Sequence, residues 1–137
     1  MFKKIAHIGV AVKDIKTATE LFTKLFGVGA THSEELPDQN VNTAMFNFDG
    51  TLIELLEATA PDSSVAKFIE KRREGVHHIS FVVDDIKQEI NRLKKLGFRL
   101  IDEKPRYGAG DYEIAFLHPQ STNGVLFEIS QKREQGQ

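Results

Sequence analysis

The sequence contains one pattern twice, and this duplication constrains the fold more than any other feature. Residues 6–15 read AHIGVAVKDI and residues 77–86 read HHISFVVDDI, so both have His-Ile, a strand-forming run and Asp-Ile. Further along, residues 50–55 (GTLIEL) and 124–129 (GVLFEI) share a glycine, three strand formers, a glutamate and an apolar residue. Matching features in the same order indicate two copies of one structural unit.

Each copy is predicted to begin with a strand and a capped helix. After each Asp-Ile pair, apolar residues recur at the spacing of an amphipathic helix. Asp14 and Asp85 precede these helices and suit the N-cap, where a side-chain oxygen accepts hydrogen bonds from free amide groups. Gly27 and Gly97 follow the helices and suit the left-handed residue that ends them.

The remainder of each copy is predicted to form strands, which completes the order βαβββ. In the first copy, residues 31–36 and 41–48 are rich in strand formers. In the second copy, residues 98–102 and 112–117 occupy the corresponding places. The strand that carries the glutamate closes each copy.

A chain of 137 residues is long enough for one compact domain and short for two independent ones. We therefore predict a single α+β domain over residues 1–137. Its first module covers about 4–59 and its second about 76–131. An ordered linker helix over about 63–74 joins them, because its first residues have the composition of an N-cap.

Composition excludes several classes of partner and ligand. The formal charge is −2 and basic residues are mostly dispersed, so no nucleic-acid partner is expected. No apolar run is long enough to span a bilayer and no signal peptide is apparent, so we expect no membrane partner and a cytoplasmic location. Cysteine is absent, so any metal site must use nitrogen and oxygen ligands.

Four residues at equivalent positions of the two copies are candidate metal ligands. Glu54 and Glu128 lie among apolar strand residues, where a buried charge would be costly without a partner. His7 and His78 occupy matching positions on the first strands. Taken singly, such a glutamate is more often salt-bridged and such a histidine more often a hydrogen-bonded core residue. Their arrangement as two matched pairs favours a His₂Glu₂ site for Co²⁺, Ni²⁺, Zn²⁺ or Mn²⁺.

The other three histidines are predicted not to be ligands. His77 is the immediate neighbour of His78 on a strand, so its side chain must point to the opposite face. A structural role, or a hydrogen bond to a ligand, suits it better. His32 and His118 have no counterpart in the other copy.

The segment 106–110 (RYGAG) is rich in glycine but does not have the Lys-Ser/Thr continuation of a phosphate-binding loop. It is also not followed by a predicted helix. The sequence leaves two interpretations open: a hairpin turn, or a flexible lip over a pocket.

With these motifs the chain resembles the vicinal oxygen chelate (glyoxalase I-like) superfamily over residues 5 to about 131. Within it, the chain is most similar to the methylmalonyl-CoA epimerase branch. That finer resemblance rests on five segments: residues 53–57 (IELLE), 61–68 (PDSSVAKF), 75–79 (GVHHI), 83–86 (VDDI) and 116–119 (FLHP).

The resemblance implies a cupped eight-stranded mixed sheet with a divalent metal in the cup, and a homodimer. It places the metal ligands at His7, Glu54, His78 and Glu128. The implied activity is the interconversion of (R)- and (S)-methylmalonyl-CoA by proton abstraction, with the enolate stabilised on the metal. We interpret Glu54 and Glu128 as both ligands and the acid/base pair.

Two alternatives remain open at this stage. Glyoxalase I (lactoylglutathione lyase) would use the same metal set on the methylglyoxal–glutathione hemithioacetal, so the thioester could belong to CoA or to a glutathione adduct. The second alternative is a metal-free small-molecule binding protein of the same fold. The chain also departs from some epimerases, because residues 42–45 (NTAM) contain no carboxylate where a candidate base stands, and Asp111 and Gln120 replace the residues common in relatives.

Overall fold

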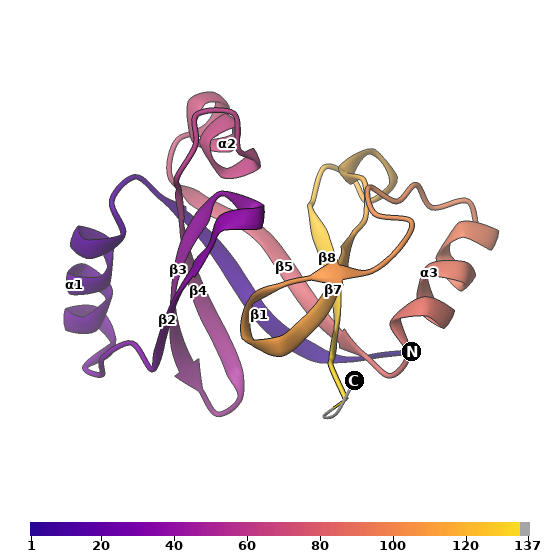
Figure 1. Ribbon diagram of the computed structural model, residues 1–137, viewed down its shortest axis with the longest axis horizontal. Helices are drawn as coiled ribbons and strands as arrows, with labels where there is room; N and C mark the ends of the chain where they lie inside the picture. The colour runs from indigo at the N-terminus through magenta and orange to yellow at the C-terminus, as the bar shows by residue number, and fades with distance from the viewer. Residues whose placement is uncertain (135–137) are drawn as a thin grey trace. The chain divides into compact units, whose positions relative to one another are not determined.

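The computed structural model describes residues 1–134 (Figure 1). The chain divides into two compact units. The N-terminal unit comprises His7–His77, and the C-terminal unit comprises Met1–Ala6 together with the chain from His78 onward. The first six residues therefore group with the second half of the sequence.

The elements alternate as the duplication predicts. In chain order they are β1 (Phe2–Val12), α1 (Ile15–Phe26), β2 (His32–Leu36), the 3-10 helix η1 (Pro37–Gln39), β3 (Val41–Phe48), β4 (Thr51–Ala58), α2 (Ser64–Arg72), β5 (Gly75–Val83), α3 (Ile86–Lys95), β6 (Arg106–Tyr107), the 3-10 helix η2 (Ala109–Asp111), β7 (Tyr112–Phe116), the 3-10 helix η3 (Pro119–Ser121) and β8 (Phe127–Lys132).

The strands are hydrogen-bonded in the order β2-β3-β4-β1-β5-β8-β7-β6. Within each unit the first strand pairs in parallel with the last, β1 with β4 and β5 with β8. The other pairs, β2–β3, β3–β4, β6–β7 and β7–β8, are antiparallel. The sheet is therefore mixed, and the histidine-bearing and glutamate-bearing strands of each copy are direct neighbours.

In the N-terminal unit, α1 covers one face of the strands (Figure 1). The helix begins at the predicted cap, where the Asp14 carboxylate accepts hydrogen bonds from the amides of Lys16 and Thr17. It ends at Gly27, whose φ of 74° is left-handed. Phe46 and Leu55 are fully buried beneath it. Their neighbours in sequence point to the other face of the strands, which is where Glu54 lies.

The predicted linker is an ordered helix, α2. The Ser63 hydroxyl caps it by accepting a hydrogen bond from the amide of Ala66 at 3.1 Å. Val65 is buried against Val41 and Leu56, so α2 packs on the strands of the N-terminal unit. Burial of this apolar face fixes the linker against its own unit.

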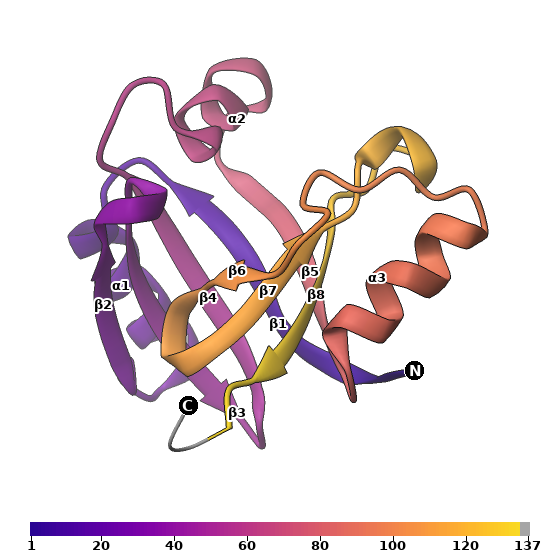
Figure 2. The ribbon, with the colours of Figure 1, turned by 45° about the vertical axis from the view of Figure 1, so that its right-hand side comes forward.

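In the C-terminal unit, α3 covers β5, β7 and β8 in the corresponding way (Figure 2). Ile90 and Leu93 on the helix pack against Val83 and Ile129 of the strands. Alternation along β5 and β8 places the neighbouring residues, including Glu128, on the opposite face. None of the helices among residues 1–134 is long and apolar enough to span a membrane.

The predicted strand over residues 98–102 is wrong. Only an isolated bridge between Leu100 and Leu117 forms there, and the next strand is the short β6. The Asp102 carboxylate accepts the amide hydrogen of Phe116 at 2.9 Å, and thereby takes the place of a backbone carbonyl. This side-chain bond interrupts the ladder that a continuous strand would need.

The burial of α3 predicts a matched pair of stability effects. Ile90→Ala removes a side chain that is 2% exposed, and should lower the free energy of unfolding by about 2–5 kcal/mol. Leu96→Ala, at a position 62% exposed, should change it by less than about 0.5 kcal/mol. Urea denaturation of both variants checks this, and equal losses would contradict the assigned packing of α3.

Candidate metal centre

The N-terminal unit brings together the first predicted histidine–glutamate pair. His7 lies on β1 and Glu54 on the parallel neighbour β4, where Glu54 is in register with Gly9. The Nε2 atom of His7 lies 3.7 Å from Oε1 of Glu54. Their side chains are only 14% and 6% exposed. Two polar groups are thus buried side by side on the face opposite α1.

The C-terminal unit repeats this geometry. His78 lies on β5 and Glu128 on β8, where Glu128 is in register with Ser80. The Nε2 atom of His78 lies 3.9 Å from Oε1 of Glu128, and both side chains are 4% exposed. The duplication therefore yields two equivalent His–Glu pairs, as the sequence predicts.

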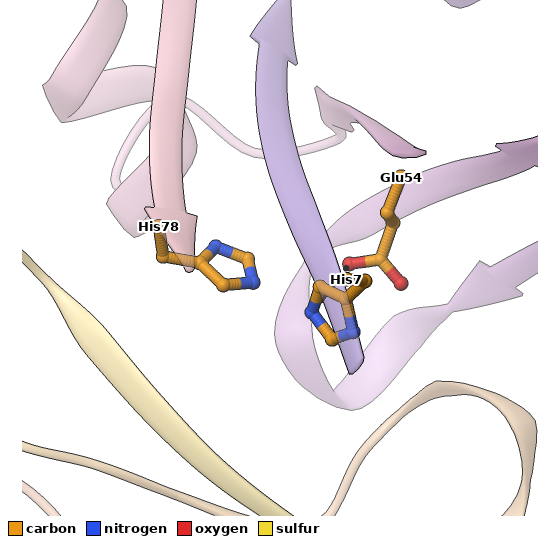
Figure 3. A group of neighbouring side chains, drawn as sticks. All are labelled: His7, Glu54 and His78. Atoms are coloured by element: carbon orange, nitrogen blue, oxygen red, sulfur yellow. Dashed lines mark ion pairs between the residues drawn. The ribbon is translucent and has the colours of Figure 1, made fainter. Parts of the chain in front are cut away.

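Three of the four residues form a group that could hold a metal ion. One ligand atom from each of His7, Glu54 and His78 lies within 4.8 Å of the other two (Figure 3). In Figure 3 the Glu54 carboxylate lies beside the His7 imidazole. Glu128 is not a member of this group of three, so its role as a fourth ligand stays a prediction.

The protonation state of His7 suits a metal ligand. Burial lowers the pKa of its imidazole to about 4, because desolvation disfavours the charged form. The ring is therefore neutral near pH 7, and one ring nitrogen carries a free lone pair. Metal binding requires this neutral form.

Glu128 is the most deeply buried carboxylate of the site. Burial raises its pKa to about 7, while a hydrogen bond from Ser80 and the charge of Arg106 act in the opposite direction. The charge of Asp102 raises it further. A buried carboxylate that loses its water is stabilised by a nearby cation. The imidazole and carboxylate donors of His7, Glu54 and His78 fit a divalent metal.

The three remaining histidines have other contacts. His77 is buried, and its ring packs edge-on against Phe68 with the centroids 5.1 Å apart. His32 is exposed and its Nε2 lies 2.9 Å from a carboxylate oxygen of Glu34. Nδ1 of His118 accepts a hydrogen bond from a backbone amide of η3. The group of three includes none of them.

Two features of the site were missed by the sequence analysis. Ser80 and Ser130 are fully buried beside Glu128, with their hydroxyl oxygens 3.3 Å apart. The Phe116 ring stands edge-on to His78 at 5.3 Å. Strand alternation could have found the first, because Ser80 is two residues from His78 and Ser130 two from Glu128.

Comparison with known proteins now gives the family. A model of the Glyoxalase/Bleomycin resistance protein/Dioxygenase superfamily matches residues 6–116. The chain belongs to this superfamily. The match covers the first copy of the repeat and most of the second, so it confirms the resemblance to the vicinal oxygen chelate proteins.

Individual relatives of this superfamily member are similar over nearly its whole length. An uncharacterized protein of Bacillus subtilis, YqjC, is 37% identical over 95% of the chain and 93% of its own length. The ethylmalonyl-CoA/methylmalonyl-CoA epimerase of Cereibacter sphaeroides is 33% identical over 96% of the chain and 99% of its own. The similarity to the Cereibacter epimerase confirms the expectation of an epimerase-like isomerase.

One solved structure is also similar to this chain over nearly its whole length. A variant of Streptomyces coelicolor methylmalonyl-CoA epimerase, in complex with 2-nitronate-propionyl-CoA, superposes with a TM-score of 0.93 at 33% identity. The similarity covers 96% of each chain. The predicted α+β fold, with two βαβββ modules forming one eight-stranded mixed sheet, is thereby confirmed.

The burial of Glu128 predicts a pH dependence of stability in the metal-free protein. Its folded pKa lies above the unfolded value, so its contribution is present below about pH 4.5 and is lost as the pH rises through about 7. Between pH 5.5 and 8, this loss amounts to about 2 kcal/mol. Denaturant unfolding at both pH values, with chelator present, measures it.

Glu128→Gln is the necessary control, because His7 and His77 have lowered pKa values and shift stability in the opposite direction over this pH range. The stability of the parent protein relative to Glu128→Gln should therefore fall by about 2 kcal/mol from pH 5.5 to 8. A constant difference would show that Glu128 titrates normally.

Proposed function

We propose that the protein is a metal-dependent epimerase of an acyl-CoA thioester, with methylmalonyl-CoA as the substrate. The observation that carries the proposal is the buried group of His7, Glu54 and His78, whose ligand atoms lie within 4.8 Å of one another. The names of the Cereibacter and Streptomyces relatives support the substrate. The homodimer and the cytoplasmic location expected from the sequence stay part of the proposal.

Two imidazoles and carboxylate oxygens form a ligand set of intermediate softness, which suits Co²⁺, Ni²⁺, Zn²⁺ or Mn²⁺. His7, Glu54 and His78 would hold the ion, with Glu128 as the fourth ligand. When bound, such an ion supplies a Lewis acid that stabilises negative charge developing on substrate oxygens. Burial of the ligands keeps this charge stabilisation in a region of low dielectric.

Epimerisation requires the loss of one proton and the gain of another at the α-carbon. The α-hydrogen of a malonyl thioester is acidic, because the electron pair left by C–H cleavage is delocalised as an enolate. The proton moves to the carboxylate oxygen of one glutamate. The other glutamate, as the carboxylic acid, then donates a proton to the opposite face, and the new C–H bond has the inverted configuration.

Glu54 and Glu128 are proposed as this acid/base pair. Each is buried next to a histidine, and the duplication provides one for each unit. Burial raises the pKa of Glu128 to about 7, so this carboxylate has affinity for a proton near neutral pH. Such a group can donate or accept a proton at the operating pH.

Deuterium incorporation at the α-carbon of methylmalonyl-CoA tests the proposal. We expect the protein with Co²⁺ to exchange both epimers with solvent and to interconvert them. His7→Ala and His78→Ala should lose metal binding and at least about 100-fold of the activity, because each removes a ligand. His32→Ala is the matched control, because this exposed histidine is outside the site and should leave activity unchanged.

The two glutamates can be separated by the epimer that each variant exchanges. At saturating metal, Glu54→Gln and Glu128→Gln should both lose epimerisation by about 100-fold or more. Each should still exchange the α-proton of one epimer, and the two variants should act on opposite epimers. Near-normal epimerisation by both variants would exclude this acid/base pair.

Glyoxalase I activity is the second candidate, because the matching superfamily model includes the glyoxalases. It would use the same metal and the same proton abstraction on a glutathione hemithioacetal. Isomerisation of that substrate, assayed beside the epimerase reaction, decides between them. If the protein binds no stoichiometric divalent ion and added Co²⁺ gives neither activity, a metal-free binding function replaces both.

A further inference from the structure

Arg106 is held in a fixed orientation on the short strand β6. Its Nε lies 3.2 Å from Oδ1 of Asp102. The second oxygen of Asp102 accepts the amide hydrogen of Phe116 at 2.9 Å, so this carboxylate is itself fixed to β7. The side chain of Asp102 is only 16% exposed. One edge of the guanidinium is therefore tied to the sheet.

The same guanidinium lies above the ring that borders the C-terminal His–Glu pair. Its Cζ is 5.5 Å from the centroid of Phe116, close enough for a cation–π contact. The Phe116 ring stands edge-on to His78, with the centroids 5.3 Å apart. Phe116 is also in register with Glu128 on the neighbouring strand. A single aromatic ring thus separates Arg106 from two of the proposed site residues.

Strands β6 and β7 form a hairpin (Figure 2), and Arg106 lies on its first strand. Arg106 is in register with Ile114 of β7. A Cβ atom at Gly108 would lie 2.8 Å from the side chain of Ile114, so only glycine permits this close approach. At the next position, the guanidinium of Arg133 lies over the Tyr107 ring, and its Cζ is 4.3 Å from the ring centroid. Residues 106–110 lie in this hairpin, as one of the two interpretations of the segment predicts.

The other edge of the guanidinium faces solvent. The contacts of Arg106 among residues 1–134 are with Asp102 and the Phe116 ring, together with its charge interaction with Glu128. The four N–H groups of its terminal nitrogens are therefore not taken by a protein acceptor in this part of the chain. The side chain is 45% exposed. A planar fork held this way matches the two oxygens of a carboxylate or phosphate.

We propose that Arg106 is a specificity-determining residue that binds an oxyanion of the thioester substrate through its terminal nitrogens. This inference rests on the proposed function, and it gives the hairpin 106–110 a role in recognition. Asp102 orients the fork and Phe116 supports it, so little side-chain entropy is lost when the anion binds. The anion is either the free carboxylate of the acyl group or a phosphate of the CoA nucleotide.

Calorimetric titration of the metal-loaded protein with three ligands tests the inference and identifies the anion. Malonyl-CoA carries both anions, propionyl-CoA lacks the free carboxylate, and adenosine 3′,5′-bisphosphate carries only nucleotide phosphates. Arg106→Gln should weaken malonyl-CoA binding at least about tenfold, which corresponds to about 1.4 kcal/mol. Arg106→Lys, which keeps the charge without the fork, should recover only part of the loss.

The pattern of losses distinguishes the two sources. If the fork binds the acyl carboxylate, Arg106→Gln weakens malonyl-CoA alone. If it binds phosphate, the affinities for all three ligands fall together. Arg99→Gln is the matched control, because Arg99 is exposed and contacts Gln120 in η3. Affinities within twofold of the parent protein for all three ligands, or an equal loss in the control, would overturn the inference.

If the proposed function is wrong, the titrations give a result different from a loss in the Arg106→Gln variant alone. If the parent protein binds none of the three ligands, the CoA thioester is the wrong substrate class. Malonate and pyrophosphate are then titrated while the Nε–H signal of Arg106 is followed by NMR. A saturable shift of that signal supports the anion site with another substrate, and no shift overturns it.

Discussion

The burial of two carboxylates in the middle of apolar strands is the constraint on which the rest of the structure depends. An ionised carboxylate without water or a partner would cost more than a small domain can spare. Glu54 and Glu128 each lie beside a histidine of the neighbouring parallel strand. The His7 imidazole is neutral near pH 7 and does not compensate the negative charge of Glu54, so a bound cation is favoured there. The candidate metal site and the stability of the strands are therefore linked.

The fold meets this constraint by separating an apolar face from a polar one on the same strands. Val83 and Ile129 pack under α3, while Ser80 and Glu128 point to the other face of β5 and β8. Helices α1 and α3 cover the apolar faces, opposite the glutamates. Their packing holds the strands in a register that places each histidine next to a glutamate. The positions of the histidines and glutamates thus depend on the packing of α1 and α3 against the opposite face of the strands.

The repeat, the helix caps and the pairing of each strand histidine with a strand glutamate could be predicted because they depend on local spacing and on strand alternation. The strand over residues 98–102 could not, because Asp102 replaces a backbone acceptor of Phe116 with its own carboxylate. Residues 98–102 have the composition of a strand whether or not this hydrogen bond forms, so their composition could not reveal it. The role of Arg106 was also hidden, since the ring that supports it lies ten residues further along the chain.

The two copies share a geometry but differ in what surrounds their glutamates. Ser80 and Ser130 are buried next to Glu128, and Ser80 donates a hydrogen bond to it. The equivalent positions of the first copy are Gly9 and Leu56, which bring no hydroxyl. The charge of Arg106 acts to lower the pKa of Glu128. Duplication therefore supplies two buried His–Glu pairs, while divergence of their neighbours gives the two carboxylates different surroundings.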